Sequence, residues 1–264
     1  MNEVNKTLYI PLYGKALVSQ IGIINKDEMA QKIWSTSGLK MHGKAKSKWL
    51  AYNMAMRSRV FDDYVKDNID DDTLVLHLGC GLDSRCFRIN KKAKWLDVDF
   101  EDVINERKKF YQENAEYKML SFDITETNKL LELPNAKKAL VVMEGVSMYF
   151  DNNKLLNILN TLSTKYAQVQ IILDTYTSFA AKISKYKNPA NELGVNNFYG
   201  IDDIAELIKD SDYKLIKELS FTPRYLVDEL KGFEHFFFKL MFVNKLYGKF
   251  YKLQVLKKVK SKDN

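Results

Sequence analysis

The chain has 264 residues, 46% of them apolar and 28% charged, which suits one large α/β domain or a domain with an added subdomain. Its net charge is +7, but residues 245–264 hold seven lysines and one acid, so the remaining residues carry only +1 and the pattern does not predict nucleic-acid binding. No apolar run approaches the roughly 18 residues of a membrane span or forms an N-terminal signal segment, so we expect no membrane partner.

Residues 1–72 are predicted to be mostly helical. Apolar residues recur at three- and four-residue spacing in residues 26–34 and 46–68, which is typical of amphipathic helices. The second segment could bury one stripe of six side chains: Trp49, Tyr52, Met56, Val60, Phe61 and Tyr64. The acidic run NIDDD at 68–72 then ends the helix with turn-prone residues. We therefore expect an N-terminal helical cap over residues 1–72 and a second unit over residues 73–264.

Short apolar runs of strand length then alternate with helical stretches. The predicted strands cover residues 73–79, 94–99, 117–123, 138–145 and 169–176, and the helices between them include residues 101–114 and 152–166. Alternation of this kind indicates βαβ units and a parallel sheet. The nearly continuous apolar character of LVLHLG and ALVVM fits strands that are covered on both faces.

The last third of the chain is less regular. After a loose stretch at 184–200, the pattern predicts a helix at 201–212, an alternating strand at 213–221, a helix at 227–249 and another alternating strand at 250–259. The final strand would suit a sheet edge with its lysines facing water. We expect a seven-stranded, mostly parallel sheet in which residues 250–259 run antiparallel.

A glycine turn follows the first predicted strand, in LHLGCGLDSR at residues 76–85. Gly79 and Gly81 let the backbone turn tightly and approach a ligand closely. Asp97 and Asp99 end the next strand, where a carboxylate can accept hydrogen bonds from both hydroxyls of a ribose. The turn and the acids together predict a nucleotide-type cofactor, and the alternative is a tight turn followed by an ordinary pair of surface acids.

Two cofactors fit this arrangement. A dinucleotide site has a third glycine where this chain has Ser84, which disfavours a nicotinamide cofactor without excluding it. S-adenosylmethionine needs a glycine turn against its methionine part and an acid for its ribose, but no site for a pyrophosphate. Cys80 and Cys86 form neither a disulfide framework nor a zinc set, so we expect no metal and a reducing, cytoplasmic location.

Further segments extend the pattern to a known family. SFDIT at 121–125 and VVMEGVSMYFD at 141–151 contain the ends of the third and fourth predicted strands. With LHLGCGLDSRCFR, WLDVDFEDV and the upstream AMRSRVFDDYV, they resemble the leucine carboxyl methyltransferase family in order and spacing, most of all its bacterial tetracenomycin polyketide O-methyltransferase-like branch. The resemblance runs from about residue 13 to the C-terminus.

The resemblance implies a Rossmann-like class I methyltransferase that uses S-adenosylmethionine. The residues that it places at the cofactor are Gly79 and Gly81 at the methionine part, Asp99 at the ribose, Asp123 and Ile124 at the adenine, and Glu144, Arg57 and Lys15 at the charged methionine end. Arg59 competes with Arg57 for its role, and Asp97 competes with Asp99. The acceptor pocket is predicted from four aromatic residues: Tyr149, Tyr176, Phe198 and Tyr199.

Several conspicuous residues are interpreted as structural. His77 is expected to be a hydrogen-bonded core residue. Arg85 and Arg88 are expected to pair with Asp83 or with helix ends. The phenylalanines at positions 233 and 236–238 are expected to pack as helix core.

The expected activity is O-methylation of a small molecule. The acceptor would be a carboxylate or a phenolic or enolic hydroxyl on a polyketide-like compound. No catalytic residue is predicted, because a carboxylate is already ionised at neutral pH, whereas a phenol with a pKa near 10 benefits from a base. The alternatives are a nicotinamide-dependent oxidoreductase, a carboxyl methyltransferase acting on a protein C-terminus, and a protein that binds the cofactor without turnover. The sequence does not indicate an oligomeric state.

Overall fold

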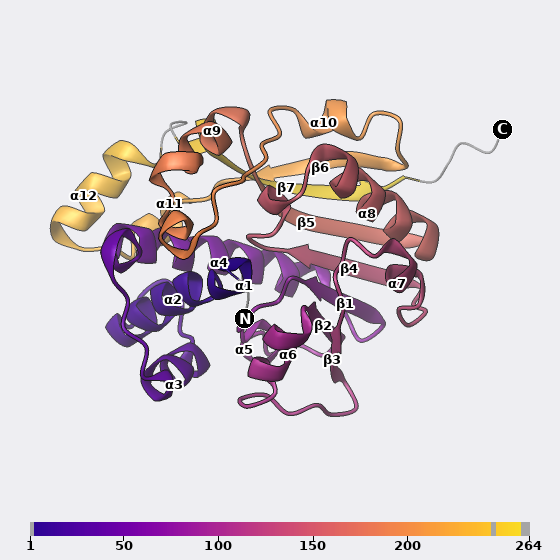
Figure 1. Ribbon diagram of the computed structural model, residues 1–264, viewed down its shortest axis with the longest axis horizontal. Helices are drawn as coiled ribbons and strands as arrows, with labels where there is room; N and C mark the ends of the chain where they lie inside the picture. The colour runs from indigo at the N-terminus through magenta and orange to yellow at the C-terminus, as the bar shows by residue number, and fades with distance from the viewer. Residues whose placement is uncertain (1–2, 244–246, 260–264) are drawn as a thin grey trace.

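Seven strands form one sheet in the computed structural model, which describes residues 3–243 and 247–259 (Figure 1). The strands are β1 (Thr73–Leu78), β2 (Lys94–Asp99), β3 (Tyr117–Ser121), β4 (Lys138–Met143), β5 (Gln168–Tyr176), β6 (Tyr213–Leu219) and β7 (Tyr251–Lys258). Their order across the sheet is β3-β2-β1-β4-β5-β7-β6. Among these strands only β7 runs in the opposite direction to the rest, so the predicted seven-stranded, mostly parallel sheet is confirmed.

Helices precede the sheet and connect its strands. The α-helices are α1 (Glu3–Lys6), α2 (Tyr9–Ile21), α3 (Glu28–Ser37), α4 (Lys48–Asn68), α5 (Arg85–Arg88), α6 (Glu101–Arg107), α7 (Thr127–Leu131), α8 (Asn152–Lys165), α9 (Ser178–Lys187), α10 (Ile204–Leu207), α11 (Arg224–Val227) and α12 (Gly232–Met241). The 3-10 helices are η1 (Gly43–Lys46), η2 (Ser147–Tyr149), η3 (Pro189–Leu193) and η4 (Tyr247–Lys249). None of the helices in the described part of the chain is long and apolar enough to cross a membrane.

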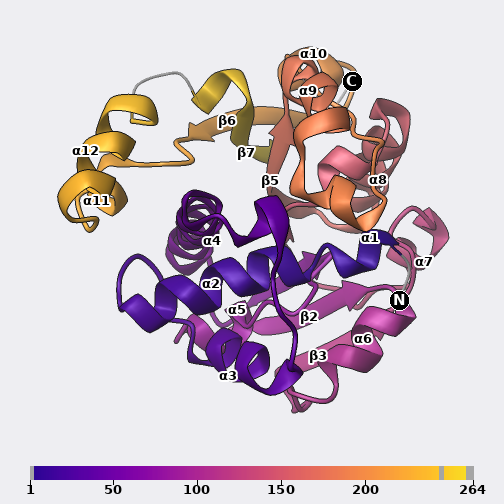
Figure 2. The same ribbon diagram turned by 60° about the vertical axis from the view of Figure 1, so that its left-hand side comes forward.

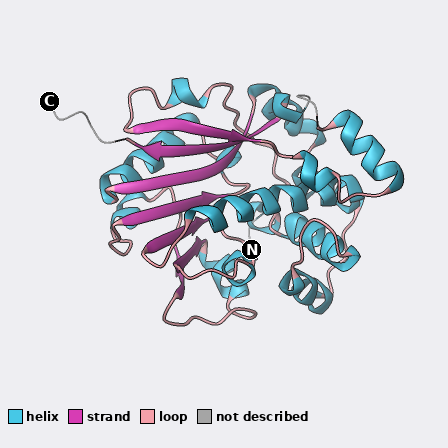
Figure 3. Ribbon diagram, turned by 180° about the vertical axis from the view of Figure 1, so that it is seen from behind, coloured by secondary structure: helices cyan, strands magenta, loops and turns pink. Residues whose placement is uncertain are grey.

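The sheet is covered by helices on both faces (Figures 1 and 3). Successive side chains of a strand point to opposite faces, so neighbouring residues of β1 enter different cores. Val75 packs in the core that contains α4, whereas Leu74 and Leu76 pack in the core that contains α8. Burial on both faces explains why the parallel strands read as continuous apolar runs.

The N-terminal helices pack directly against the sheet (Figure 2). Phe61 and Val65 of α4 belong to the same apolar cluster as Val75 of β1 and Val142 of β4. Side chains of α2 and α3 join the same cluster. The division of the chain after residue 72 remains a prediction, and the segments on either side of it share one hydrophobic core.

β7 is an interior strand, so the prediction that its lysines mark a sheet edge was wrong. It lies between β5 and β6 and pairs antiparallel with both. Leu253, Val255 and Leu256 in its middle are buried, and its lysines stand near its two ends. The edge strand at this side of the sheet is β6, most of whose side chains are at least partly exposed.

The helix predicted at 227–249 is also shorter than expected. α12 begins at Gly232 and ends at Met241. The φ of Gly232 is +57°, which is not a right-handed helical value, so the helix does not extend back toward α11. Residues 244–246 lie outside the described residues. The interpretation of its phenylalanines as helix core is correct for the buried Phe238 and wrong for Phe233 and Phe236, which are 65% and 64% exposed.

Candidate active site

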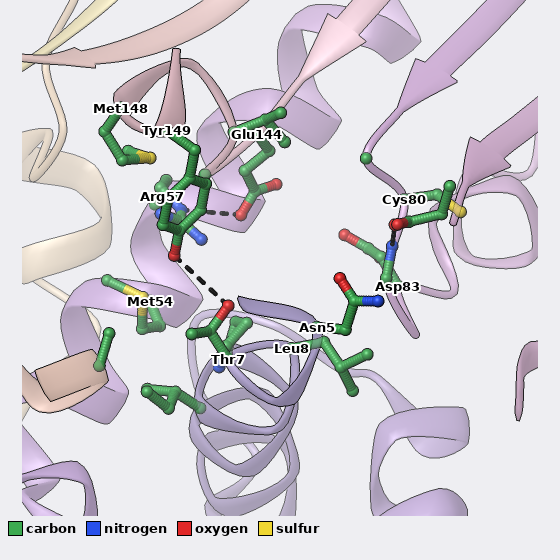
Figure 4. A pocket seen from close by; sticks show the side chains of 18 of the residues that line it. Asn5, Thr7, Leu8, Met54, Arg57, Cys80, Asp83, Glu144, Met148 and Tyr149 are labelled. Carbon is green, nitrogen blue, oxygen red and sulfur yellow. Dashed lines mark hydrogen bonds and ion pairs between the residues drawn. The ribbon is translucent and has the colours of Figure 1, made fainter. Parts of the chain in front are cut away.

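A cavity of about 580 Å³ lies at the carboxyl ends of the parallel strands. In doubly wound sheets this is the edge at which ligands bind, and the volume is in the range of roughly 300–1,000 Å³ typical of small-molecule sites. The ends of β1, β2 and β4 form its floor, and α2, α4, α9 and η3 contribute to its walls. Figure 4 shows Asn5, Thr7 and Leu8 from the first residues of the chain at the same cavity. Helices before the sheet therefore form part of the site.

The glycine turn after β1 lines the cavity and has no room for side chains at its first position. Gly79 has a φ of +72°, and a Cβ atom there would lie 2.4 Å from a methyl group of Val146. Gly81 has a φ of +52°, and its N–H donates to Asp99 at 2.8 Å. The helix that follows, α5, has only four residues. The turn therefore offers a ligand its own backbone rather than the N-terminus of a long helix.

The two acids at the end of β2 have different surroundings. Asp97 is fully buried, is absent from the cavity wall, and pairs with Arg107 while accepting the hydroxyl of Tyr117 at 2.8 Å. Asp99 lines the cavity and accepts the N–H groups of Gly81 and Phe100, each at 2.8 Å. Burial raises the pKa of Asp99 above its ordinary value, which those two N–H groups oppose. Of the two competing residues, Asp99 is the one in contact with the cavity.

Asp123 and Ile124 follow β3 and line the same cavity. Oδ1 of Asp123 accepts the N–H and the hydroxyl of Thr125, at 2.9 and 2.8 Å. Its Oδ2 accepts no hydrogen bond from the described residues. Ile124 is buried and offers an apolar surface beside that carboxylate. The pair can bind a flat group that carries a hydrogen-bond donor on its edge.

Arg57 enters the cavity from α4 and is anchored at two nitrogens. Its Nε donates to Glu144 at 2.8 Å, and its Nη1 donates to Asp174 at 3.2 Å. Arg59, its competitor, instead pairs with Asp63 one helical turn away and does not line the cavity. These contacts already occupy Nε and Nη1 of the guanidinium.

Glu144 joins Arg57 to a buried network of ions. Its second carboxylate oxygen pairs with Arg85, whose side chain is fully buried. Burial would raise the pKa of Glu144, but the guanidinium groups of Arg57 and Arg85 outweigh it and lower this pKa from 4.5 to about 2. Glu144 therefore stays ionised at neutral pH and presents a fixed negative charge to the cavity.

The network contains five carboxylates and four cationic side chains. They are Asp27, Asp62, Asp83, Glu144 and Asp174, with Lys15, Arg57, Arg85 and Arg88. Burial opposes ionisation of Asp83, yet Arg85, Lys15 and Arg88 hold its pKa well below the ordinary range. Lys15 of α2 reaches the cavity and lies 3.2 Å from Asp83. The interpretation of Arg85 and Arg88 as ion-paired residues is confirmed.

His77 is confirmed as a core residue. Only 2% of it is exposed, and its two ring nitrogens lie 3.4 Å from Asp97 and 3.3 Å from Arg85. Within the described residues, no group of three or more His, Cys, Asp or Glu side chains could hold a metal ion.

The predicted acceptor residues divide into two groups. Tyr149 and Tyr176 line the cavity, where the Tyr149 hydroxyl donates to Thr7 at 3.3 Å (Figure 4). Phe198 is buried behind both rings and Tyr199 is 44% exposed, and neither lines the cavity. Burial raises the pKa of Tyr149 to about 12, so its hydroxyl stays protonated at neutral pH.

The part of the cavity that Tyr149 and Tyr176 line is otherwise largely apolar, and we call it the apolar half. Its lining includes Leu50, Met54, Met148, Ala180, Ile183 and Pro189, with Ser184 and Asn188 as polar members. These residues come from α4, η2, α9, η3 and the chain just before η3. An apolar molecule with one or two hydrogen-bonding groups fits such a lining.

Asp174 and Tyr251 take part in the site without having been predicted. Asp174 ends a buried apolar run, IILD, at the carboxyl end of β5, and that placement could have marked it. No comparable pattern in the sequence marks Tyr251, because it comes close to Arg57 only through the antiparallel pairing of β7 with β5. Asn5, Thr7 and Leu8 were likewise missed, since nothing in their local pattern predicts that they return to the cavity.

Residues 5–163 match the leucine carboxyl methyltransferase family. The chain belongs to this family. The family resemblance is thereby confirmed, although the match begins before residue 13 and ends well before the C-terminus. Within the described structure, the matched region contains all eight residues that the resemblance placed at the cofactor.

Two curated proteins resemble this leucine carboxyl methyltransferase family member over part of their length. The tetracenomycin polyketide synthesis O-methyltransferase TcmP of Streptomyces glaucescens is 30% identical over 158 residues, which is 58% of either chain. The S-adenosyl-L-methionine-dependent methyltransferase dpfgK of Gibberella zeae is 27% identical over 173 residues, with the same shares covered. The chain therefore matches less than two thirds of the length of these relatives.

Among solved structures, the fold is similar to that of magnesium protoporphyrin IX methyltransferase (ChlM) from Synechocystis PCC 6803 with bound SAH. The TM-score is 0.53 at 12% identity, over 93% of this chain and 100% of that one. At this identity the likeness concerns the fold alone. It confirms the Rossmann-like class I methyltransferase fold that the strand pattern and the resemblance predicted.

Proposed function

We propose that this protein is an S-adenosylmethionine-dependent methyltransferase that methylates an oxygen atom of a small, mostly apolar molecule. The observation that carries the proposal is a single cavity that brings together the glycine turn, Asp99, Asp123, Glu144 and Arg57 from four strand ends and α4. Family membership supports the same reaction class. We also expect it to act in the cytoplasm, without a nucleic-acid or membrane partner.

The cavity residues fit the cofactor part by part. The turn at Gly79 admits a close backbone approach that a side chain would block. Asp99 can accept the ribose hydroxyls, and Asp123 with Ile124 can bind the adenine edge. Arg57 and Lys15 suit a carboxylate and Glu144 suits an ammonium group, which are the two charged groups of the methionine end. When bound, the cofactor supplies an electrophilic methyl group on a positively charged sulfur.

The protein's contribution to the reaction is mainly positioning. The walls of the cavity would orient an acceptor oxygen toward the methyl group that a bound cofactor supplies. If the acceptor oxygen is an anion, as in a carboxylate or a hydroxyl that has already lost its proton to water, its negative charge and the positive charge on sulfur would cancel during the transfer, so an apolar lining such as Met54 and Met148 would not oppose the reaction. Tyr149 stays protonated at neutral pH and can therefore donate a hydrogen bond to the acceptor, but it cannot serve there as a base.

The class of acceptor follows from the lining of the apolar half of the cavity. An apolar wall with tyrosine hydroxyls and the Asn188 amide suits a flat molecule that bears a hydroxyl or a carboxylate. The name of TcmP, a polyketide O-methyltransferase, supports a polyketide-like acceptor.

Calorimetric titration tests the cofactor first. We expect S-adenosylhomocysteine to bind and NADH not to bind, and the reverse result would favour the oxidoreductase. Transfer of a labelled methyl group to an aromatic acid, to the matching phenol and to a peptide C-terminus then tests the acceptor. Methylation of the peptide alone would favour a protein substrate. Binding without transfer to any acceptor in a broad aromatic screen would favour a binding protein.

A further inference from the structure

Asp174 is a buried carboxylate two residues before the end of β5, and it reaches the cavity only through other residues. Its side chain is fully buried and does not line the cavity. Oδ1 accepts the Gly145 N–H at 2.7 Å and Oδ2 accepts Nη1 of Arg57 at 3.2 Å. Its backbone carbonyl also accepts the hydroxyl of Ser147. Asp174 therefore ties α4 to the turn that follows β4.

The nitrogens of Arg57 are divided between these partners and the cavity. Nε donates to Glu144, and Nη1 donates to Asp174 and, at 3.4 Å, to the Tyr251 hydroxyl. Nη2 donates to no residue in the described part of the chain. A Cβ atom on Gly145 would lie 3.2 Å from Nη2, so the absent side chain leaves that nitrogen its space. Nη2 is thus the nitrogen of Arg57 that remains for a ligand.

A planar guanidinium needs two anchoring points before its third nitrogen has a fixed direction. Glu144 provides the first point, but it is shared, because its other oxygen pairs with Arg85. Asp174 provides the second point, and Arg57 is the only cationic side chain among the described residues with which it pairs. Burial raises the pKa of Asp174, while Arg57 and the Gly145 N–H favour its charged form.

We propose that Asp174 is a positioning residue of the cofactor site, which turns the Nη2 edge of Arg57 toward the place of the cofactor carboxylate. The identity of that ligand rests on the proposed function. Asp174 acts only through Arg57 and the Gly145 turn, and it touches neither the cofactor nor the acceptor.

Two effects compete when Asp174 loses its charge, and their balance gives the sign of the expected change. A neutral residue would repel the cofactor carboxylate less. However, an asparagine has one acceptor oxygen for two donors, Nη1 of Arg57 and the Gly145 N–H, so either Arg57 loses its second anchor or the turn beside it loses its own. S-adenosylhomocysteine, the ligand of the experiment below, carries one ammonium and one carboxylate, so removing a negative charge from the ion network changes its overall electrostatic attraction little. We therefore expect Asp174→Asn to weaken cofactor binding.

The experiment is a double-mutant cycle on the affinity for S-adenosylhomocysteine, measured by calorimetry. Asp174→Asn should raise the Kd roughly tenfold, about the value of one hydrogen bond to a charged group. In the Arg57→Lys background the same substitution should add less than about twofold, because the anchored group is already gone. Asp97→Asn is the matched control: it removes an equally buried, arginine-paired carboxylate away from the cavity, and it should lower stability more than affinity.

The outcomes separate this inference from the proposed function. If the wild-type protein does not bind S-adenosylhomocysteine, the proposed function fails. If the wild type binds it and Asp174→Asn leaves the Kd within twofold, or if its effect is fully additive with Arg57→Lys, the positioning role is overturned while the function stands. Should Asp174→Asn not fold, Asp174→Glu keeps the negative charge but moves the carboxylate from its place beside Nη1 of Arg57. A loss that vanishes in the Arg57→Lys background supports the role, and an unchanged affinity contradicts it.

Discussion

At the scale of single residues, Asp97 and Asp99 lie two positions apart but have different roles: Asp97 pairs with a buried arginine, and Asp99 lines the cavity. Asp97 points into the protein and neutralises Arg107, and that arginine also donates to the Gly81 carbonyl at 3.0 Å. Asp99 points to the cavity and keeps backbone partners that leave lone pairs on both oxygens. Residues two apart in a strand point to the same face of the sheet, so the two surroundings differ because Asp99 is the last residue of β2, at the cavity, whereas Asp97 lies within the strand.

We expect alanine substitutions at these two positions to have opposite profiles. Asp99→Ala should weaken S-adenosylhomocysteine binding by roughly 1.5–3 kcal/mol, the value of hydrogen bonds to a charged group, with little loss of stability. Asp97→Ala should lower the free energy of unfolding by about 3–5 kcal/mol, because it leaves the buried Arg107 unpaired. Calorimetry and urea unfolding of both variants measure the two quantities. If Asp97→Ala lowered the affinity more than Asp99→Ala, the assignment of the ribose to Asp99 would be wrong.

The low pKa of Glu144 predicts how stability changes in acid. Its folded pKa of about 2 lies below the ordinary value of 4.5, so its ion pairs stabilise the protein fully above pH 4.5. That contribution, about 3 kcal/mol for a shift of this size, is lost as the pH falls from 4.5 toward 2. The difference in unfolding free energy between wild type and Glu144→Gln should therefore narrow over this interval. A constant difference between pH 7 and pH 2 would contradict the prediction.

At the scale of elements, helices that precede the sheet line the cavity together with α9 and η3, which connect β5 and β6. Thr7 reaches Tyr149, and Asn5 donates to Asp102 at the start of α6 with a separation of 2.5 Å. Lys15 of α2 and Arg57 of α4 supply charge from the same layer. A ligand in the cavity would thus bind to the helical layer and to the sheet at once.

Cofactor binding should therefore protect residues 5–65 from hydrogen exchange. Binding free energy that engages Lys15 and Arg57 is available only when α2 and α4 are docked, so the ligand should suppress their local opening. Exchange measured with and without S-adenosylhomocysteine tests this, and residues 155–165 of α8, none of which lines the cavity, serve as an internal control. Arg57→Lys should reduce both the protection and the affinity, because an ammonium group cannot span Glu144, Asp174 and a ligand. Unchanged exchange and affinity together would make this layer packing alone.

At the scale of the whole molecule, the sequence predicted what depends on local pattern. Apolar runs of strand length located the strands, and Gly79 and Gly81 marked the turn because few other residues tolerate its backbone. The position of β7 inside the sheet could not be predicted, since it depends on pairing with strands far away in the sequence. The proposed role of Asp174 could not be predicted either, because it depends on a contact with Arg57, which is 117 residues away in the sequence.

The two halves of the cavity differ in how freely substitutions can accumulate in them. The charged half is made of buried ions that are one another's partners, so a single replacement such as one at Arg85 strands a charge and costs several kcal/mol. The apolar half includes Ile183, Ser184 and Asn188, which are only partly buried on segments outside the sheet. Substitutions at such positions usually change stability by less than about 0.5 kcal/mol. Specificity for the acceptor can therefore change through single substitutions in the apolar half, whereas residues of the charged half can be replaced only together with their ion-pair partners.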